Sequence, residues 1–539
     1  MSNNIVRGTM LLTGATFLSK FLGMIYFIPF NELVGATGVT LYSYAYIPYN
    51  IFISISTVGV PLAVSKFVSK YNSLGDYRTG LRMFRTGMLL MAVTGLLAFF
   101  VLFFSAEPLA HLMITTKDAG TISAADVAMV IRMVSFALLI IPAMSLVRGF
   151  FQGYQSMGPT AISQVVEQII RIVFLLGAVY IVLVLLDGTI STAVGFATFS
   201  AFIGALASCI VLWVYWQKRK THINQQVQQQ EQTYQISTKD LIVELFRYAG
   251  PFVVVGIATS LYQLVDQFTF ERAMAAIDKS NWEVAYSAIN GNGHKLIIIP
   301  VTIATGLSLA ILPALTKTFT QKNWSSLYQQ INQALQIVMV LVIPAAVGLL
   351  MLSDIIYGAL FGLKHIEITG PLLAWYAPVA LLFALFTVSA SILQGINQQR
   401  FAVISLSAGL LLKILFNIQL IYTFGAKGAI FGTGLAVGIA VLLNLWRVVV
   451  SIGFPLKQTI KRTILIGIFS LIMALVLWFV EWVVGMFLPY ESNRLAAVIM
   501  LIVGVVVGGG VYLWLGYFST LLERILGNRI RILDRVFRR

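Results

Sequence analysis

The sequence is poor in charge and nearly free of cysteine. Asp, Glu, Lys and Arg together make up 10% of its 539 residues, whereas 59% are hydrophobic. Soluble domains carry about a quarter charged residues, so this composition excludes a soluble protein and predicts an integral membrane protein. Cys209 is the one cysteine, which excludes an intramolecular disulfide and a thiolate metal site.

Signatures of catalysis and of metal binding are absent from the sequence as well. It has no P-loop pattern, which excludes an ATP-driven pump. The four histidines and the carboxylates do not cluster, and no Ser, His and Asp arrangement is suggested. We therefore expect no bound metal, no cofactor and no enzyme activity. The N-terminus MSNNIVRGTM lacks the features of a cleaved signal peptide, so the first span should stay in the mature protein.

Long apolar runs occupy most of the chain. A membrane-spanning helix needs roughly 20 apolar residues, and about fourteen runs are long enough. Their length and spacing favour helices over the alternating strands of a barrel. The predicted fold is an all-α integral membrane protein with about fourteen transmembrane helices. The runs are 9–34, 41–65, 87–113, 125–150, 160–186, 190–216, 247–271, 284–315, 333–359, 371–394, 402–422, 429–450, 463–487 and 495–518.

The net charge of +16 is concentrated on one side of these runs. That side includes Lys66, Lys70, the Lys218–Lys220 cluster and the basic tail 519–539. Positively charged loops stay inside the cell, so both termini are predicted to be cytoplasmic. The excess charge then reflects topology and gives no reason to expect a nucleic-acid partner. We also expect the basic tail to lie on anionic membrane lipids.

The chain contains an internal repeat. FQGYQSMGPTAISQVVEQIIRIVF (151–174) aligns with LQGINQQRFAVISLSAGLLLKILF (393–416) at a constant offset of 242 residues, and Arg171 falls on Lys413. A weaker echo links GVPLAVSK (59–66) with GLSLAILPALTK (306–317). The repeat predicts two six-helix lobes related by an axis along the membrane normal, with a cavity between them and alternating access as the consequence.

The predicted organisation has five parts. Each lobe holds six spans, and a Gln-rich, apolar-poor segment joins the two lobes. Two further spans and a basic tail follow the second lobe. The parts are 1–216 (N-terminal lobe), 217–246 (cytoplasmic linker), 247–452 (C-terminal lobe), 453–518 (extra helix pair) and 519–539 (cytoplasmic tail).

Several cations lie deep inside predicted spans. Inserting a charged side chain there costs about 2.5–3.5 kcal/mol, so such a residue is expected to have a counter-ion or a functional role. Lys20 and Lys295 are too deep to reach an interface easily, and Arg171 and Lys413 lie at similar depth. We expect these four residues to line the cavity and bind substrate. Structural pairing is the alternative role for Lys20 and Lys295.

The acidic residues at this depth are fewer. Glu167 precedes Arg171 by four residues on one helical face, which predicts a local neutral pair. Asp266 could pair with a facing cation or bind a small cation, and His294 could pack helices by hydrogen bonding or relay protons. The remaining surplus of lysine predicts a positive cavity suited to an anion.

Prolines inside the spans predict kinks, because proline removes a backbone hydrogen bond. Pro29 and Pro300 are the hinge candidates. Ordinary helix irregularity is the alternative, since proline is frequent in membrane helices.

Three segments of the sequence resemble a known superfamily. SKFLG (19–23), GVPLAVSKFVSKYNSLGDY (59–77) and HKLIIIPVTIATGLSLAILPALTK (294–317) look like the multidrug/oligosaccharidyl-lipid/polysaccharide (MOP) exporters. Over nearly the whole chain the sequence is most similar to the lipid II flippases of peptidoglycan synthesis. The resemblance implies a V-shaped protein of the bacterial plasma membrane. It would move lipid II, an undecaprenyl-pyrophosphate-linked disaccharide-pentapeptide, to the outer leaflet.

The resemblance also assigns roles to individual residues. The flippases carry S-R-x-L-G in the first span, matched here with Lys20 in place of the required Arg. Their eighth-span motif D-R-L-x-E-x-P is matched at Lys295 and Pro300, while His294 replaces the Asp and Ile298 replaces the Glu. A further required Arg has no counterpart in YNIFISIST (49–57). Since lysine cannot grip a phosphate bidentately, the headgroup contacts must differ in detail.

In the family, the last two spans are thought to border a groove for the lipid tail. The region 463–518 is apolar enough for that role, and its glycines would allow a chain to approach closely. These glycines are Gly504, Gly508, Gly509 and Gly510.

The leading hypothesis is a lipid II flippase driven by the membrane potential or by a Na⁺ or H⁺ gradient. Alternatives are an exporter of another polyprenyl-linked glycan and a cation-coupled multidrug exporter. A third alternative is a membrane scaffold that docks cell-wall synthesis proteins or division enzymes. The two extra spans and the surplus of lysine argue against the drug exporter.

Overall fold

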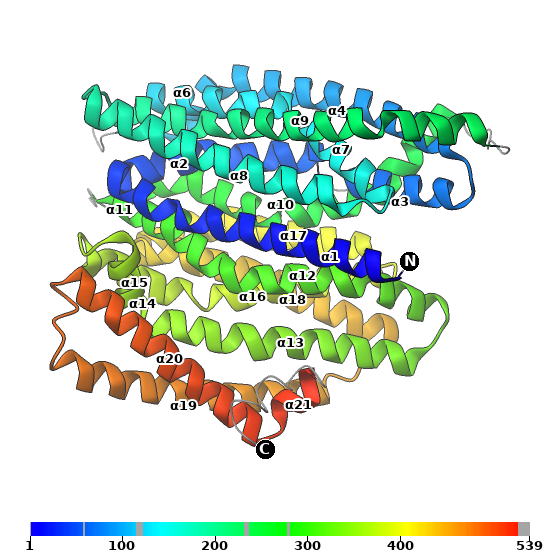
Figure 1. Ribbon diagram of the computed structural model, residues 1–539. Helices are drawn as coiled ribbons and strands as arrows, with labels where there is room; N and C mark the ends of the chain where they lie inside the picture. The colour runs from blue at the N-terminus through cyan, green and yellow to red at the C-terminus, as the bar shows by residue number, and fades with distance from the viewer. Residues whose placement is uncertain (1, 58–59, 115–121, 231–236, 278–280, 527–539) are drawn as a thin grey trace. The chain divides into compact units, whose positions relative to one another are not determined.

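The computed structural model describes residues 2–57, 60–114, 122–230, 237–277 and 281–526. Within these ranges the chain is helical and contains no β-strand (Figure 1). It divides into two compact units, Met1–Phe268 and Thr269–Arg539, hereafter unit 1 and unit 2. The all-α class predicted from the apolar runs is confirmed.

Unit 1 is built from nine complete helices and the first part of a tenth, counted over the described residues. They are α1 (Ser2–Ile25), α2 (Phe27–Thr57), α3 (Val60–Ser73), α4 (Tyr77–Phe104), α5 (Ala106–Met113), α6 (Ala124–Ser135), α7 (Ile141–Gly153), α8 (Met157–Tyr180), α9 (Ile190–Gln229) and α10 (Thr238–Ala276). A 3₁₀ turn, Phe136–Leu139, precedes α7, and a π-helical turn, Ile181–Leu185, ends α8. Helix α8 packs against both α1 and α9.

Unit 2 begins within α10 and contains the remaining helices. They are α11 (Trp282–Tyr286), α12 (Asn292–Thr320), α13 (Trp324–Met351), α14 (Ser353–Phe361), α15 (Ile366–Tyr376), α16 (Val379–Gly395), α17 (Gln399–Phe424), α18 (Lys427–Ile452), α19 (Lys457–Gly485), α20 (Arg494–Phe518) and α21 (Leu521–Leu526). A π-helical segment, Ser287–Gly291, joins α11 to α12. Helices α17 and α18 pack together as α8 and α9 do in unit 1.

Within the described residues, twelve helical stretches are long and apolar enough to cross a membrane. The first, Gly14–Thr57, is interrupted at Gly35, whose φ of 64° does not fit a right-handed helix. This break falls between the first two predicted spans. Helix α10 is 39 residues long but is not one of the twelve. The multi-pass membrane class is confirmed, and the count of fourteen stays a prediction.

The backbone supports the internal repeat at its strongest alignment. Helix α7 ends at Gly153 and α16 ends at Gly395, 242 residues later. Two residues beyond each end, Gln155 (φ 56°) and Asn397 (φ 59°) adopt the left-handed conformation. The amide of each donates to the carbonyl three residues back, at 2.8 and 3.2 Å. The same C-terminal cap thus closes equivalent helices in both units.

The weaker echo has a structural counterpart too. Gly75 (φ 77°) and Lys322 (φ 55°) are left-handed residues 247 residues apart, which is the offset between Gly59 and Gly306. The next residue in each case, Asp76 or Asn323, caps the following helix with its side chain. Since both turns repeat, the similarity extends beyond the aligned helices.

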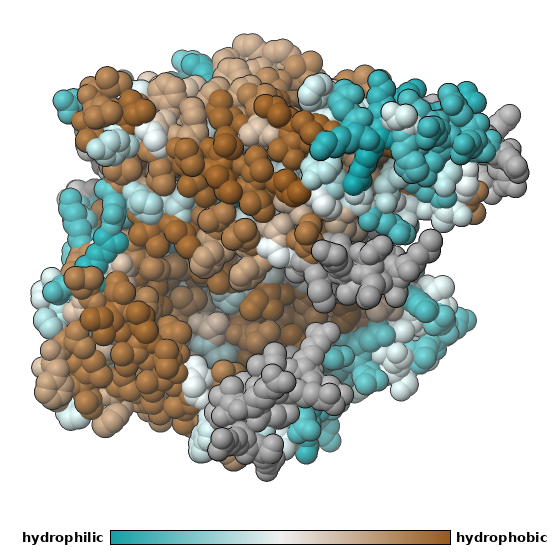
Figure 2. Space-filling model, viewed as in Figure 1, coloured by the Kyte–Doolittle hydropathy of each residue, from teal (hydrophilic) through white to brown (hydrophobic). Residues whose placement is uncertain are grey.

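Surface composition agrees with a membrane protein. In Figure 2, apolar side chains cover the middle of the helices in each unit and hydrophilic ones gather at the helix ends. Helix α9 extends past the apolar region into the Gln-rich sequence and ends at Gln229. Residues 231–236 of the predicted linker and 527–539 of the predicted basic tail lie outside the described residues.

The hinge candidates differ in structure. Helix α1 ends at Ile25 and α2 begins at Phe27, so Pro29 lies in the first turn of α2, and a hinge at Pro29 stays a prediction. Pro300 lies inside the continuous helix α12. The irregular turn of that span comes earlier, at Ser287–Gly291.

Candidate functional site

In unit 1 the predicted site residues lie on α1 and α8. Thr16 donates to Gln164 at 3.2 Å, and the position of a Cβ on Gly23 is 3.2 Å from the Gln168 amide nitrogen. Lys20 stands between Thr16 and Gly23 at helical spacing, so it belongs to the same face of α1. Its side chain is exposed. The predicted substrate cation is therefore accessible beside a polar face of α8.

Arg171 lies on α8 and is held by tyrosines of α2. Its guanidinium donates to the hydroxyl of Tyr46 and, at 3.4 Å, to that of Tyr42. It also stacks over the Tyr46 ring, 5.3 Å from the centroid. The two tyrosine rings are stacked 4.2 Å apart, and Tyr42 shares a hydrogen bond with Tyr26. These are neutral partners, so the positive charge of Arg171 is positioned without being cancelled.

The predicted pair of Glu167 and Arg171 is wrong. Glu167 instead accepts a 2.6 Å hydrogen bond from Arg148 of α7. The same guanidinium donates to Ser163 at 2.9 Å and to Ser208 at 2.8 Å. A pair on one helix turn contributes about 0.2–0.5 kcal/mol, whereas charge-assisted bonds in a largely buried network are roughly twice as strong as neutral ones. Glu167 therefore pairs with Arg148 and not with Arg171.

Sequence analysis missed Arg148. The available signal was its position inside the apolar run 125–150, where a cation needs a partner. Because Glu167 neutralises Arg148, no ion pair joins Lys20 or Arg171 to a carboxylate in the described part of unit 1. A surplus of positive charge around the whole site stays a prediction.

In unit 2 the predicted residues follow an irregular turn. The sequence NGNG (290–293) contains the end of the π-helical segment and the first turn of α12. A Cβ on Gly293 would lie 2.0 Å from the carbonyl oxygen of Ala288, so the turn requires glycine there. The wide turn positions His294 and Lys295, and such π-turns are frequent at functional sites.

His294 and Lys295 are both half-buried. The Nδ1 atom of His294 shares a 3.0 Å hydrogen bond with the hydroxyl of Tyr376. Lys295 and Lys413 both act electrostatically on His294, so the two lysines lie near this imidazole in unit 2.

A buried phenol supports the same turn. Asn292 donates to the hydroxyl of Tyr357 at 2.9 Å. Tyr357 belongs to the short helix α14, outside the candidate spans, and burial raises its pKa to about 12. The hydrogen bond between Asn292 and Tyr357 ties the first turn of α12 to α14.

Lys413 differs from the prediction that it contacts substrate. Its side chain is completely buried, and its ammonium donates to Thr433 of α18 at 2.8 Å. One turn further along α17, Asn417 donates to Thr269 at 2.7 Å. A ligand cannot reach Lys413 in this conformation, so its role here is to join helices of unit 2. Asp266, on α10, is buried as well.

The last helix pair, α19 and α20, packs on other helices of unit 2 and leaves much apolar surface exposed. Arg494 at the start of α20 donates to the Ala359 and Leu360 carbonyls, and Tyr512 donates to that of Val340. Of the glycines predicted to admit a lipid chain, Gly504 and Gly508 contact leucine side chains, whereas Gly509 and Gly510 face open space. A groove for the lipid tail stays a prediction.

Solved structures share the fold of this chain. The chain superposes on a structure of lipid II flippase MurJ in an inward closed conformation, with a TM-score of 0.66 and 17% identity over 96% of this chain and 99% of that one. A MOP superfamily transporter from Pyrococcus furiosus gives a TM-score of 0.58 and 14% identity over 84% and 95%. The chain therefore has the same fold as these two structures, which is the fold that the resemblance implied.

Sequence relatives narrow the assignment. The model of the polysaccharide biosynthesis protein family matches residues 5–319, and that of lipid II flippase MurJ matches residues 283–496. The Bacillus subtilis protein named Lipid II flippase MurJ is 45% identical over 98% of both chains. Stage V sporulation protein B of the same organism is 25% identical over 85% of each. The chain belongs to the polysaccharide biosynthesis protein family and to the family of the MurJ flippase.

Proposed function

We propose that this protein is a lipid II flippase of the bacterial plasma membrane. It would move the undecaprenyl-pyrophosphate-linked precursor from the inner to the outer leaflet by alternating access. One observation carries the proposal: Arg171 is fixed by two tyrosines and keeps its charge, next to a helix face that exposes Lys20. A pyrophosphate is the kind of anion that positioned cations in a site of low dielectric constant bind well.

Other features of the chain support this proposal. The 45% identical relative is named a lipid II flippase, and it covers nearly the whole chain. Lys295 would supply a second cation in unit 2, next to His294 and after the wide turn at Gly291–Gly293. The protein acts as a transporter, and we expect it to lack enzyme activity. Both termini are expected to be cytoplasmic.

The energy source is part of the proposal. A membrane potential, negative inside, favours inward movement of positive charge and outward movement of negative charge, so it would drive transport only if the cycle moves net charge across the membrane. His294 and Asp266 are the candidates for H⁺ or Na⁺ coupling, since both are ionisable groups within helices. Liposomes with an imposed potential, pH gradient or Na⁺ gradient would separate the three modes.

The experiment uses cells depleted of other lipid II flippases and proteoliposomes of the purified protein. We expect Lys20→Gln and Arg171→Gln to abolish growth support and to lower exposure of lipid II to an external probe. The control is Lys461→Gln, an exposed lysine on α19. Full growth support by both variants, at normal abundance, would contradict the proposed site.

A second candidate is transport of another polyprenyl-linked glycan. The archaeal protein named probable low-salt glycan biosynthesis flippase Agl15 is 26% identical over 53% of this chain, which favours this candidate. The same cations would bind its phosphate. Liposomes that expose another polyprenyl lipid but not lipid II would support it. Flipping that persists without cell-wall synthesis proteins would exclude a purely scaffolding role, and efflux of a cationic dye would indicate drug export.

A further inference from the structure

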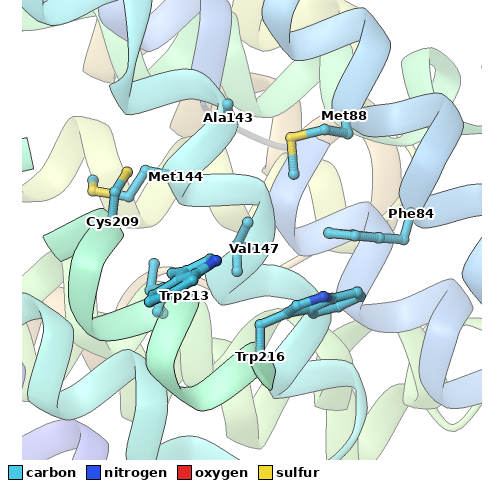
Figure 3. A pocket seen from close by; sticks show the side chains of 9 residues that line it. Phe84, Met88, Ala143, Met144, Val147, Cys209, Trp213 and Trp216 are labelled. Atoms are coloured by element: carbon cyan, nitrogen blue, oxygen red, sulfur yellow. The ribbon is translucent and has the colours of Figure 1, made fainter. Parts of the chain in front are cut away.

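Unit 1 contains an apolar groove that the proposed function does not use. It has a volume of about 280 Å³ and lies between α4, α7 and α9. Figure 3 shows the side chains of the three helices around one common space. The groove is lined by Phe84, Met88, Ala143, Met144, Val147, Cys209, Leu212, Trp213 and Trp216, and we name it the α9 groove.

The α9 groove opens onto the surface that would face lipid. Trp213 is 61% exposed and belongs to an exposed apolar stripe of α9 with Leu206 and Ile210. Across the groove, Leu89 and Val93 form a similar exposed stripe on α4. A soluble ligand would not meet this surface, whereas a lipid chain would.

Each of the two stripes ends in an exposed cation. Lys220 lies seven residues after Trp213 on the same face of α9, about 10 Å along the helix. Arg85 lies one turn before Leu89 on α4. Since α4 and α9 run in opposite directions through the membrane, both cations lie at the same end of the groove.

The three helices that line the groove carry charged residues of one sign. Helices α4, α7 and α9 contain seven Lys and Arg residues and no Asp or Glu. Arg148 is already paired with Glu167, and Arg219 donates to Ser156 while stacking over Phe151. The exposed cations therefore stand beside the groove on helices that carry no competing carboxylate.

We infer that the α9 groove binds an acyl chain of an anionic phospholipid, with the phosphate held between Arg85 and Lys220. The groove is slightly smaller than a pocket for a whole small molecule, roughly 300–1,000 Å³, so it holds part of one chain while the rest remains in the bilayer. Basic residues beside a membrane helix attract anionic headgroups. This site is separate from the proposed transport site and does not depend on it.

The test uses tryptophan quenching in nanodiscs that contain a fixed mixture of phosphatidylglycerol and phosphatidylcholine. In one sample the bromine quencher is on the phosphatidylglycerol chains, and in the other it is on the phosphatidylcholine chains. Surface potential is then identical in both samples. The groove signal is the part of the fluorescence lost in the Trp213→Phe/Trp216→Phe variant.

We expect brominated phosphatidylglycerol to reach the groove with a preference of roughly tenfold over brominated phosphatidylcholine. The Arg85→Gln/Lys220→Gln variant should lose this preference, whereas the control Lys457→Gln/Lys461→Gln on α19 should keep it. Ala143→Phe, which fills the groove, should reduce quenching by both lipids.

Two results would overturn the inference. Equal quenching by the two brominated lipids in the unchanged protein would show that the groove does not select for anionic phospholipid. Displacement of brominated phosphatidylglycerol by equimolar polyprenyl phosphate would assign the groove to the transported lipid instead.

Discussion

Arg148 of α7 and Glu167 of α8 form an ion pair in the interior of unit 1, with 2.6 Å between Nη2 and Oε2. Two serines complete the network, and one of them, Ser208, belongs to α9. The network therefore joins α7, α8 and α9. Glu167 is the carboxylate nearest in sequence to Arg171. Because Glu167 pairs with Arg148, Arg171 forms its hydrogen bonds with tyrosines instead.

Breaking this pair should destabilise the protein. Glu167→Gln leaves the Arg148 charge largely buried without a counter-ion, which costs about 3 kcal/mol. We expect a clear fall in the melting temperature of the purified protein in detergent. The double variant Arg148→Met/Glu167→Leu should lose less than the sum of the single variants. Strictly additive losses would contradict a coupled pair.

The contribution of Arg171 to transport can be tested separately from the stability of the protein. Arg171→Gln should lower the rate of lipid II flipping by at least roughly tenfold, because a charged hydrogen bond contributes about 1.5–3 kcal/mol. Tyr46→Phe keeps the ring beneath the guanidinium and removes one acceptor, so its effect should be smaller. Tyr180→Phe, an exposed position on α8, serves as the control. An equal loss for Tyr46→Phe would shift the role from the cation to the phenol.

Close packing of α9 on α8 gives a third prediction. A Cβ on Gly204 would lie 2.8 Å from the Glu167 carbonyl oxygen and 2.9 Å from the Arg171 Cβ. Gly204→Ala should therefore lower the free energy of unfolding by about 1–3 kcal/mol. On α8 itself, a Cβ on Gly177 meets nothing within 4 Å, so Gly177→Ala should be neutral or stabilising. Denaturation of both variants in the same detergent makes the comparison.

The wide turn before Lys295 gives the fourth. Gly293→Ala places a methyl group 2.0 Å from the Ala288 carbonyl oxygen, so the turn must rearrange and displace His294 and Lys295. We expect flipping to be lost even where folded protein is recovered. Gly306→Ala lies on the same helix with open space around the new methyl group, and it should retain activity. Loss of activity in both variants would argue against a special role for the turn.

Sequence alone predicted the helical membrane class, the repeat and the deep cations. These follow from hydrophobic runs and from one alignment, which are local or periodic signals. It predicted the partner of Glu167 wrongly, because Arg148 is 19 residues away and reaches Glu167 only through the packing of α7 on α8. Spacing within one helix could not reveal that contact.

Arg171 and Lys413 occupy equivalent repeat positions, but their environments could not be predicted from the repeat. The repeat places both on matching helices, yet Arg171 is partly accessible and Lys413 is completely buried. The positions in unit 2 that correspond to Arg148 and Glu167 are Ala390 and Gly409, which cannot form an ion pair. Different neighbours thus give the same repeat position a different environment.

The paired left-handed turns at Gln155 and Asn397 have a practical consequence. Their flanking sequences differ, but the backbone joints are alike, so they are matched points at which segments of the two halves could be exchanged. Chimeras cut at these joints would keep every cap intact while swapping one set of side chains for the other. Because each joint lies inside its own half, such chimeras would exchange part of one half for the matching part of the other.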